Sequence, residues 1–76
     1  MTKAQQILDG LGGPDNVSAV EPCITRLRVE VVDAGLVDEP ALKAAGAFGI
    51  VRSGRVIQVV VGPEADDLAL DIGRLR

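Results

Sequence analysis

The amino-acid sequence predicts a single α+β domain over residues 1–76, in which three helices cover one face of a four-stranded antiparallel sheet. Three observations predict this fold class. Apolar residues recur with helical spacing in three segments, they alternate with polar residues in others, and short turns join the segments expected to pair. The expected order is helix, strand, strand, helix, strand, strand, helix, which is a split α/β sandwich of the αββαββα type.

The first expected helix is capped by Thr2 and ends at Gly12-Gly13-Pro14, because glycine adopts the left-handed cap and proline does not continue a helix. Its apolar positions are Ala4, Ile7, Leu8 and Leu11. A short strand over residues 16–21 follows. Residues 25–32 then alternate strictly, as expected of a strand with one buried face. The apolar face carries Leu27, Val29 and Val31, and the polar face carries Arg26, Arg28 and Glu30.

In the second half of the chain, Asp38 is the expected N-cap of a helix that Gly46 ends. Two strands follow, residues 48–52 and 55–61, joined by Ser53-Gly54 as a tight hairpin. Gly62-Pro63-Glu64 opens the last helix, whose inward positions are Ala65, Leu68, Ala69, Ile72 and Leu75. Because both strand pairs have short connections, both are antiparallel, and one face of the sheet stays open to solvent.

The composition excludes several kinds of function. A net charge of −3 and one aromatic residue, Phe48, argue against nucleic-acid binding, which uses basic surfaces and stacking side chains. The chain has no histidine and one cysteine, so a Ser-His-Asp triad, a histidine general base, a His-containing zinc site and an internal disulfide are all impossible. We expect no metal and no cofactor. No apolar run approaches the ~18 residues of a membrane span and no signal peptide is present, so we expect a cytoplasmic protein.

The segment around Cys23 carries the candidate chemistry. Cys23 lies in the expected turn between the first two strands, where free backbone N–H groups can bind an anion. Arg26 and Arg28 project from the same strand face, roughly 7 Å apart. A thiol beside two guanidiniums, the Thr25 hydroxyl and free amides suits a cysteine nucleophile that carries a phosphoryl group. Because no histidine is available to protonate a leaving group, a partner's phosphohistidine is the expected donor, and relay is expected instead of hydrolysis.

Other interpretations of these residues stay open. A lone cysteine in a small domain is often a buried small hydrophobe, and arginines on the solvent face of a strand are often only solvated. A protein-tyrosine-phosphatase loop needs arginine six residues after its cysteine, where this chain has Val29. Gln58 lies on the polar face of the last strand; it can reach a phosphoryl group on Cys23, or it can be ordinary solvent-face polarity.

The segment Cys23-Ile24-Thr25-Arg26-Leu27-Arg28, preceded by the helix and its Gly12-Gly13 turn, is matched by later segments that fall in order: Val37-Asp38-Glu39, residues 45–51 and residues 56–63. On these residues the sequence resembles the enzyme IIB domain of the glucose family of the bacterial phosphoenolpyruvate-dependent sugar phosphotransferase system. This family includes the glucose, N-acetylglucosamine and sucrose types. The resemblance covers about residues 3–76.

The resemblance implies that Cys23 accepts a phosphoryl group from a phosphohistidine of a IIA partner and passes it to a sugar bound in a membrane IIC partner. Arg26 and Arg28 match arginines of the family's site, and the second is tied particularly to transfer onto the sugar. Ile24 and Thr25 match loop positions whose backbone holds phosphate. The family's fold is a four-stranded antiparallel sheet with three helices on one face, in agreement with the element order above.

We therefore expect a phosphotransferase component, coupled to sugar transport, that acts as a monomer at the cytoplasmic face of the inner membrane. Cys23, Arg26 and Arg28 are the expected catalytic residues, and Ile24, Thr25 and Gln58 are expected to bind phosphate. The alternative is a non-catalytic regulatory or interaction module with the same fold. Binding to a partner that persists after the thiol is blocked would favour that alternative.

Overall fold

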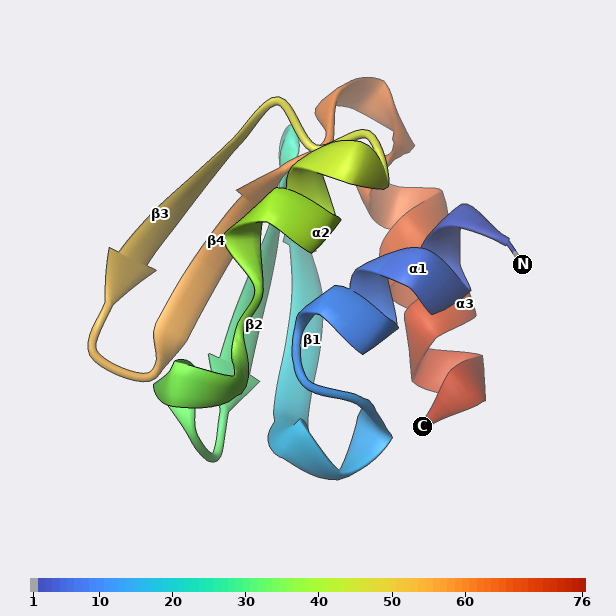
Figure 1. Ribbon diagram of the computed structural model, residues 1–76. Coiled ribbons are helices and arrows are strands. Elements are labelled where there is room, and N and C mark those ends of the chain that lie inside the picture. Colours follow the sequence, from blue (N-terminus) through green and yellow to red (C-terminus); the bar gives the residue numbers. More distant parts are fainter. Residues whose placement is uncertain (1) are drawn as a thin grey trace.

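The computed structural model describes residues 2–76 and has the predicted layers, with three α-helices on one side of a four-stranded antiparallel sheet (Figure 1). The strands lie in the order β1-β2-β4-β3, so β2 and β4 form the centre of the sheet. The elements are α1 (Lys3–Gly10), β1 (Val17–Cys23), β2 (Arg26–Val31), α2 (Glu39–Ala44), β3 (Gly49–Ser53), β4 (Val56–Val60) and α3 (Ala65–Leu75). Three 3-10 turns, Pro14–Asn16, Ala34–Leu36 and Gly62–Glu64, connect them.

The helices begin where the sequence predicts caps. The Thr2 hydroxyl accepts a hydrogen bond from the N–H of Gln5 at 3.2 Å, and the Asp38 carboxylate accepts one from the N–H of Ala41 at 3.1 Å. Each bond satisfies a backbone donor that the first turn of a helix leaves without a partner. The third helix follows directly on the 3-10 turn Gly62–Glu64 and has acidic residues in its first turn, as the helix dipole favours.

The core lies between the sheet and the helical layer. The largest fully buried side chains are Ile7, Leu8, Leu11, Leu27, Val29, Leu42, Ile57, Val59, Val61 and Ile72. These residues come from the apolar faces predicted for each segment, but Leu75, predicted to face inward, is exposed at the end of α3. The alternate residues of the two central strands point to the opposite, open face of the sheet. Burial of each large apolar side chain contributes about 1.5–3 kcal/mol relative to exposure, which is why the alternation determines which face the helices cover.

The buried side chain of Asn16 connects the end of α1 with the segment that follows β2. Asn16 is 4% exposed. Its side-chain amide nitrogen donates to the carbonyl of Leu11 at 2.7 Å and to that of Asp33 at 3.0 Å, and its amide oxygen accepts from the N–H of Asp33 at 2.9 Å. Asn16 was expected to begin the first strand. It lies instead in a 3-10 turn, where these bonds tie the end of α1 to the end of β2.

Both hairpins are displaced slightly from their predicted positions. Cys23 pairs with Arg26, so β1 runs two residues beyond the predicted end and Cys23 is its last residue instead of a turn residue. The second hairpin turns at Gly54 and Arg55, not at Ser53 and Gly54, because Ser53 pairs with Val56. This places Gly54, with φ of +60°, at the first central position of the turn, as a type II′ hairpin requires.

Candidate functional site

The thiol lies at one end of the open face of the sheet. Cys23 is exposed, which argues against its interpretation as a buried small hydrophobe. It pairs across the sheet with Arg26 of β2, and Arg26 pairs in turn with Val60 of β4. Residues directly opposite in antiparallel strands project from the same face. Cys23 and Arg26 are therefore immediate neighbours on the side of the sheet away from the helices.

The turn that follows the thiol has an unusual backbone. Ile24 and Thr25 are the two central residues of the β1–β2 hairpin, and Ile24 has φ of +58°. A positive φ is an outlier for a β-branched residue, because its Cβ crowds the backbone. The Ile24 side chain is 90% exposed, so packing of this side chain does not compensate for the strain. Such outliers concentrate at functional sites, where the surrounding structure holds them in place.

Two hydrogen bonds anchor this turn to the end of β4. The carbonyl of Thr25 accepts from the N–H of Val61 at 3.0 Å and from the N–H of Gly62 at 2.9 Å. Within residues 2–76, the N–H groups of Ile24 and Thr25 donate to no protein acceptor. Two successive unpaired N–H groups beside an exposed thiol are suitable donors to an anion attached there. The two predicted loop residues, Ile24 and Thr25, thus have free N–H groups beside Cys23.

A second row of side chains crosses the same face, two residues along each strand from the thiol. It consists of Glu21, Arg28, Gln58 and Val51, in the order of the strands. Arg28 is thus diagonal to Cys23, at a separation of about 7–8 Å between backbones, which a long side chain can bridge. The predicted placement of both arginines on one face is confirmed by this register. Gln58 lies beside them, on the face predicted for it.

The two arginines have different partners. Arg26 donates from Nη1 to the amide oxygen of Gln58 at 3.0 Å, and this leaves the amide N–H groups of Gln58 for another acceptor. Arg28 forms an ion pair with Glu21, with Nη1 and Oε1 3.2 Å apart. Glu21 was not among the predicted site residues. Its position two residues before Cys23 on a strand is the signal that would have placed it on the same face.

Two exposed apolar side chains flank the thiol end of the sheet. Ile24 is one, and Phe48, which is 77% exposed, is the other. A Cβ built on Gly62 would lie 3.3 Å from the Phe48 ring, so the ring rests against the glycine whose N–H binds the turn. Apolar side chains that border a polar site are typical of surfaces that meet another protein.

Comparisons with known proteins show the family of this chain. The family described as phosphotransferase system, EIIB, matches residues 5–38. An N-acetylglucosamine-specific EIIB component of the phosphotransferase system from Streptomyces coelicolor is 58% identical over 71 residues, which cover 93% of this chain and 92% of that protein. The chain belongs to the glucose family of phosphotransferase-system EIIB domains.

The fold of this EIIB chain also matches a solved structure. A crystal structure of one domain of a phosphotransferase-system IIabc component from Clostridium difficile superposes with a TM-score of 0.79 at 20% sequence identity. The match covers 95% of this chain and 76% of that one. At this identity the likeness shows the fold alone, and it confirms the predicted α+β class. Among residues 2–76, no helix has the length and apolar character needed to cross a bilayer.

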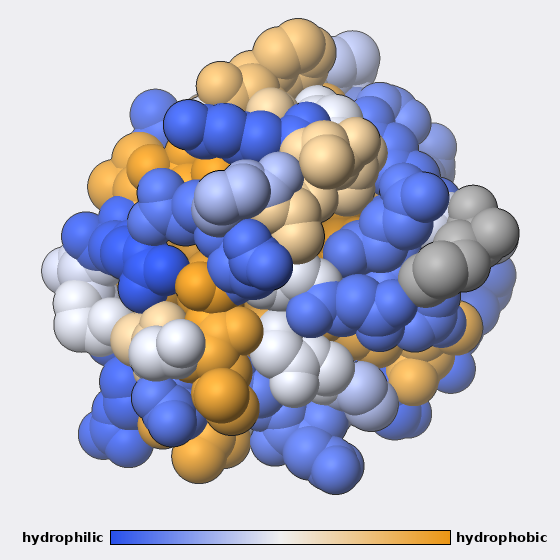
Figure 2. All heavy atoms as spheres, in the orientation of Figure 1, coloured by the Kyte–Doolittle hydropathy of each residue, from blue (hydrophilic) through white to orange (hydrophobic). Residues whose placement is uncertain are grey.

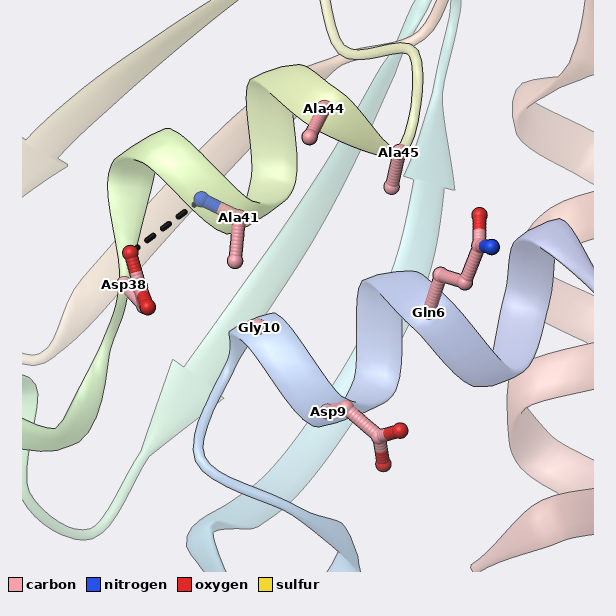
Figure 3. Close-up of a pocket in the computed structure, with 7 residues that line it drawn as sticks. All are labelled: Gln6, Asp9, Gly10, Asp38, Ala41, Ala44 and Ala45. Carbon is pink, nitrogen blue, oxygen red and sulfur yellow. Dashed lines mark hydrogen bonds between the residues drawn. The ribbon is translucent and has the colours of Figure 1, made fainter. Parts of the chain in front are cut away.

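The helix side of the EIIB chain carries a separate hollow of about 440 Å³ between α1 and α2 (Figure 3). Both of its acidic side chains are engaged within the helices, since Asp38 caps α2 and Asp9 accepts from Gln5 at 3.0 Å. The surface on this side is largely hydrophilic, with an apolar streak over the segment between β2 and α2 (Figure 2), where Val32 and Leu36 are exposed. Nothing there resembles the group of thiol, guanidiniums and free amides on the open face.

Proposed function

We propose that this EIIB chain is a phosphoryl carrier, which accepts a phosphoryl group on Cys23 from a phosphohistidine of a IIA partner and passes it to a sugar held by a membrane IIC partner. The observation that supports this most strongly is the exposed thiol directly opposite Arg26 and next to two unpaired turn amides. This combination matches the charge and the oxygen atoms of a phosphoryl group.

In the first transfer, the sulfur of Cys23 attacks phosphorus in line with the phosphorus–nitrogen bond of the donor. The S–P bond forms as the N–P bond breaks, and the imidazole departs with the electron pair and takes up the thiol proton. Arg26 and the N–H groups of Ile24 and Thr25 bind the phosphoryl oxygens as charge moves between partners. The Thr25 hydroxyl and the free amide N–H groups of Gln58 supply additional donors on the same side.

In the second transfer, a hydroxyl oxygen of the sugar attacks the same phosphorus. The S–P bond breaks, the electron pair returns to sulfur, and the hydroxyl proton restores the Cys23 thiol. Arg28 neutralises phosphoryl charge as the group leaves the sheet for the membrane partner. Ile24 and Phe48, the exposed apolar side chains beside the thiol, lie where either partner must come close.

The 58% identical relative is named for N-acetylglucosamine, and this supports N-acetylglucosamine as the sugar acceptor. The three hollows found among residues 2–76 are not lined by Cys23, Arg26 or Arg28, and we assign sugar selection to the IIC partner. The chain would work at the cytoplasmic face of the inner membrane, where it meets the IIA donor and the IIC acceptor in turn.

The test is the intact mass of the protein after incubation with phosphoenolpyruvate and the upstream phosphocarrier proteins, for wild type beside Cys23→Ser. We expect one added phosphoryl group on wild type and none on the variant, because the chain has one cysteine. Arg55→Ala, at an exposed turn in the other hairpin, is the matched control and should load like wild type. If neither wild type nor control loads from IIA proteins that are shown to be phosphorylated, the carrier function is wrong and the interaction module takes its place.

A further inference from the structure

The open face of the sheet holds acidic side chains that the two transfers do not use, and one of them lies against the arginines of the site. Glu21 lies directly opposite Arg28, and its Oε1 is 3.2 Å from Nη1 of that arginine. Both side chains are substantially exposed, at 62% for Glu21 and 43% for Arg28. A carboxylate two residues from the thiol repels any phosphoryl group attached there, so its presence in the site calls for a physical reason.

The partners of the two arginines suggest that reason. Arg26 binds the neutral amide of Gln58 and keeps its full positive charge for an anion on Cys23. Arg28 binds a carboxylate, which compensates its charge while the thiol is free. In the resting protein only one of the two guanidiniums is therefore available to an incoming anion.

The register of the strands places Arg28 within reach of two anions, the Glu21 carboxylate and a phosphoryl group on Cys23. Glu21 is directly opposite it, and Cys23 is its diagonal neighbour at about 7–8 Å between backbones. A phosphoryl group on Cys23 carries close to two negative charges and three acceptor oxygens, whereas the carboxylate carries one charge. An exposed ion pair contributes little stability, so it is readily exchanged for the stronger anion.

We propose that Glu21 is a positioning residue that holds Arg28 away from Cys23 while the thiol is free and yields it when a phosphoryl group arrives. The second half of this proposal rests on the proposed carrier function. Arg28 then contributes little to acceptance from the donor and acts during transfer onto the sugar. Without Glu21, Arg28 would stay on the thiol side of the site and would hold the phosphoryl group too firmly for rapid release.

The resting ion pair can be tested without any partner protein, by alkylation of Cys23 with iodoacetate and with iodoacetamide. The thiol displaces iodide in both reactions, and only iodoacetate carries a negative charge. The ratio of the two rates therefore reports the positive charge available to an anion at Cys23. We expect Glu21→Gln to raise the ratio about fourfold, since it frees one cation roughly 5 Å from the reagent in a water-like medium. Arg28→Ala alone should lower the ratio, because it leaves the Glu21 carboxylate without its cation.

The double variant separates repositioning from a simple change in local charge. If Glu21 holds Arg28, the fold-gain caused by Glu21→Gln is larger when Arg28 is present than in the Arg28→Ala background, and Glu21→Asp behaves like wild type. Glu30→Gln is the matched control, because it removes the same charge from the same exposed face and Glu30 has no ion-pair partner among residues 2–76. A ratio in Glu21→Gln equal to that of Glu30→Gln would overturn the proposal. An equal fold-gain from Glu21→Gln with and without Arg28 would overturn it as well.

The transfer assay then tests the exchange itself. With phosphorylated IIA, Glu21→Gln should load at the wild-type rate and should pass the group to sugar about threefold more slowly. Equal sugar transfer by Glu21→Gln and wild type would refute the exchange. If wild type takes up no phosphoryl group, the carrier function fails by itself, and the alkylation ratio still decides whether Glu21 holds Arg28.

Discussion

Replacing Ile24 with glycine is expected to make this protein more stable, although it removes a large apolar side chain. Ile24 has φ of +58° at the first central position of the β1–β2 turn. An L-residue in this left-handed region is strained by about 1–2 kcal/mol because its Cβ crowds the backbone. Glycine has no Cβ and adopts this conformation without that strain.

The magnitude follows from three contributions. Relief of strain stabilises the Ile24→Gly variant by about 1–2 kcal/mol. The side chain is 90% exposed, so its removal sacrifices almost no burial. The greater freedom of glycine in the unfolded chain costs about 0.5–1 kcal/mol. The net expectation is an increase of about 0.5–1 kcal/mol in the free energy of unfolding, or a few degrees in Tm for a domain of this size.

The assay is urea unfolding followed by circular dichroism, since the chain has no tryptophan or tyrosine for fluorescence. The other hairpin supplies a matched control with the opposite sign. Gly54 occupies the equivalent position with φ of +60°, and a Cβ added there meets nothing within 4 Å. Gly54→Ala therefore introduces backbone strain without a steric clash. Because alanine also has less freedom than glycine in the unfolded chain, the net change should be a decrease of about 0.5–1 kcal/mol in the free energy of unfolding.

A loss of stability in Ile24→Gly would refute the reasoning, provided that Gly54→Ala is destabilised as expected. That pair of results would mean that the Ile24 side chain stabilises the turn by more than its backbone strain costs. Ile24→Asn offers a further check, because asparagine tolerates a positive φ and adds less freedom to the unfolded chain than glycine does.

Three other changes test the site and its support. Arg28→Ala should reduce transfer onto sugar by tenfold or more and acceptance from IIA by less than threefold. Separate single-turnover assays of the two steps measure this, and an equal loss in both would mean that Arg28 has no special role in transfer onto sugar. Gln58→Ala should slow acceptance severalfold, because it frees Arg26 from the partner that orients it, and quench-flow loading from phosphorylated IIA measures this. An unchanged rate would mean that Gln58 has no part in acceptance. Asn16→Ala should lower the free energy of unfolding by about 3 kcal/mol, since it removes three hydrogen bonds, of which one is buried and two are partly buried. A variant no less stable than wild type in urea unfolding would contradict this.

Much of the site was predictable because it depends on alternation along one strand. The period of two places Arg26 and Arg28 on the face opposite Leu27 and Val29, and burial of the apolar pair decides which face meets the helices. The same rule, applied one strand earlier, would have placed Glu21 on the face of Cys23. The turn of the second hairpin was placed one residue too early, because glycine suits more than one position in a tight turn.

The sequence by itself determined the order of the elements, the face that each strand buries and the kinds of group beside the thiol. The short connections also predict that β1 pairs with β2 and β3 with β4. Tertiary structure alone decided that β4 lies beside β2, because a strand's alternation specifies its faces but not its lateral partners. In the order β1-β2-β4-β3, Gln58 of β4 accepts a hydrogen bond from Arg26 of β2, and Glu21 of β1 forms an ion pair with Arg28 of β2. Tertiary contacts also hold Ile24 in a conformation that its own side chain disfavours, since the Thr25 carbonyl is bound by two N–H groups at the end of β4.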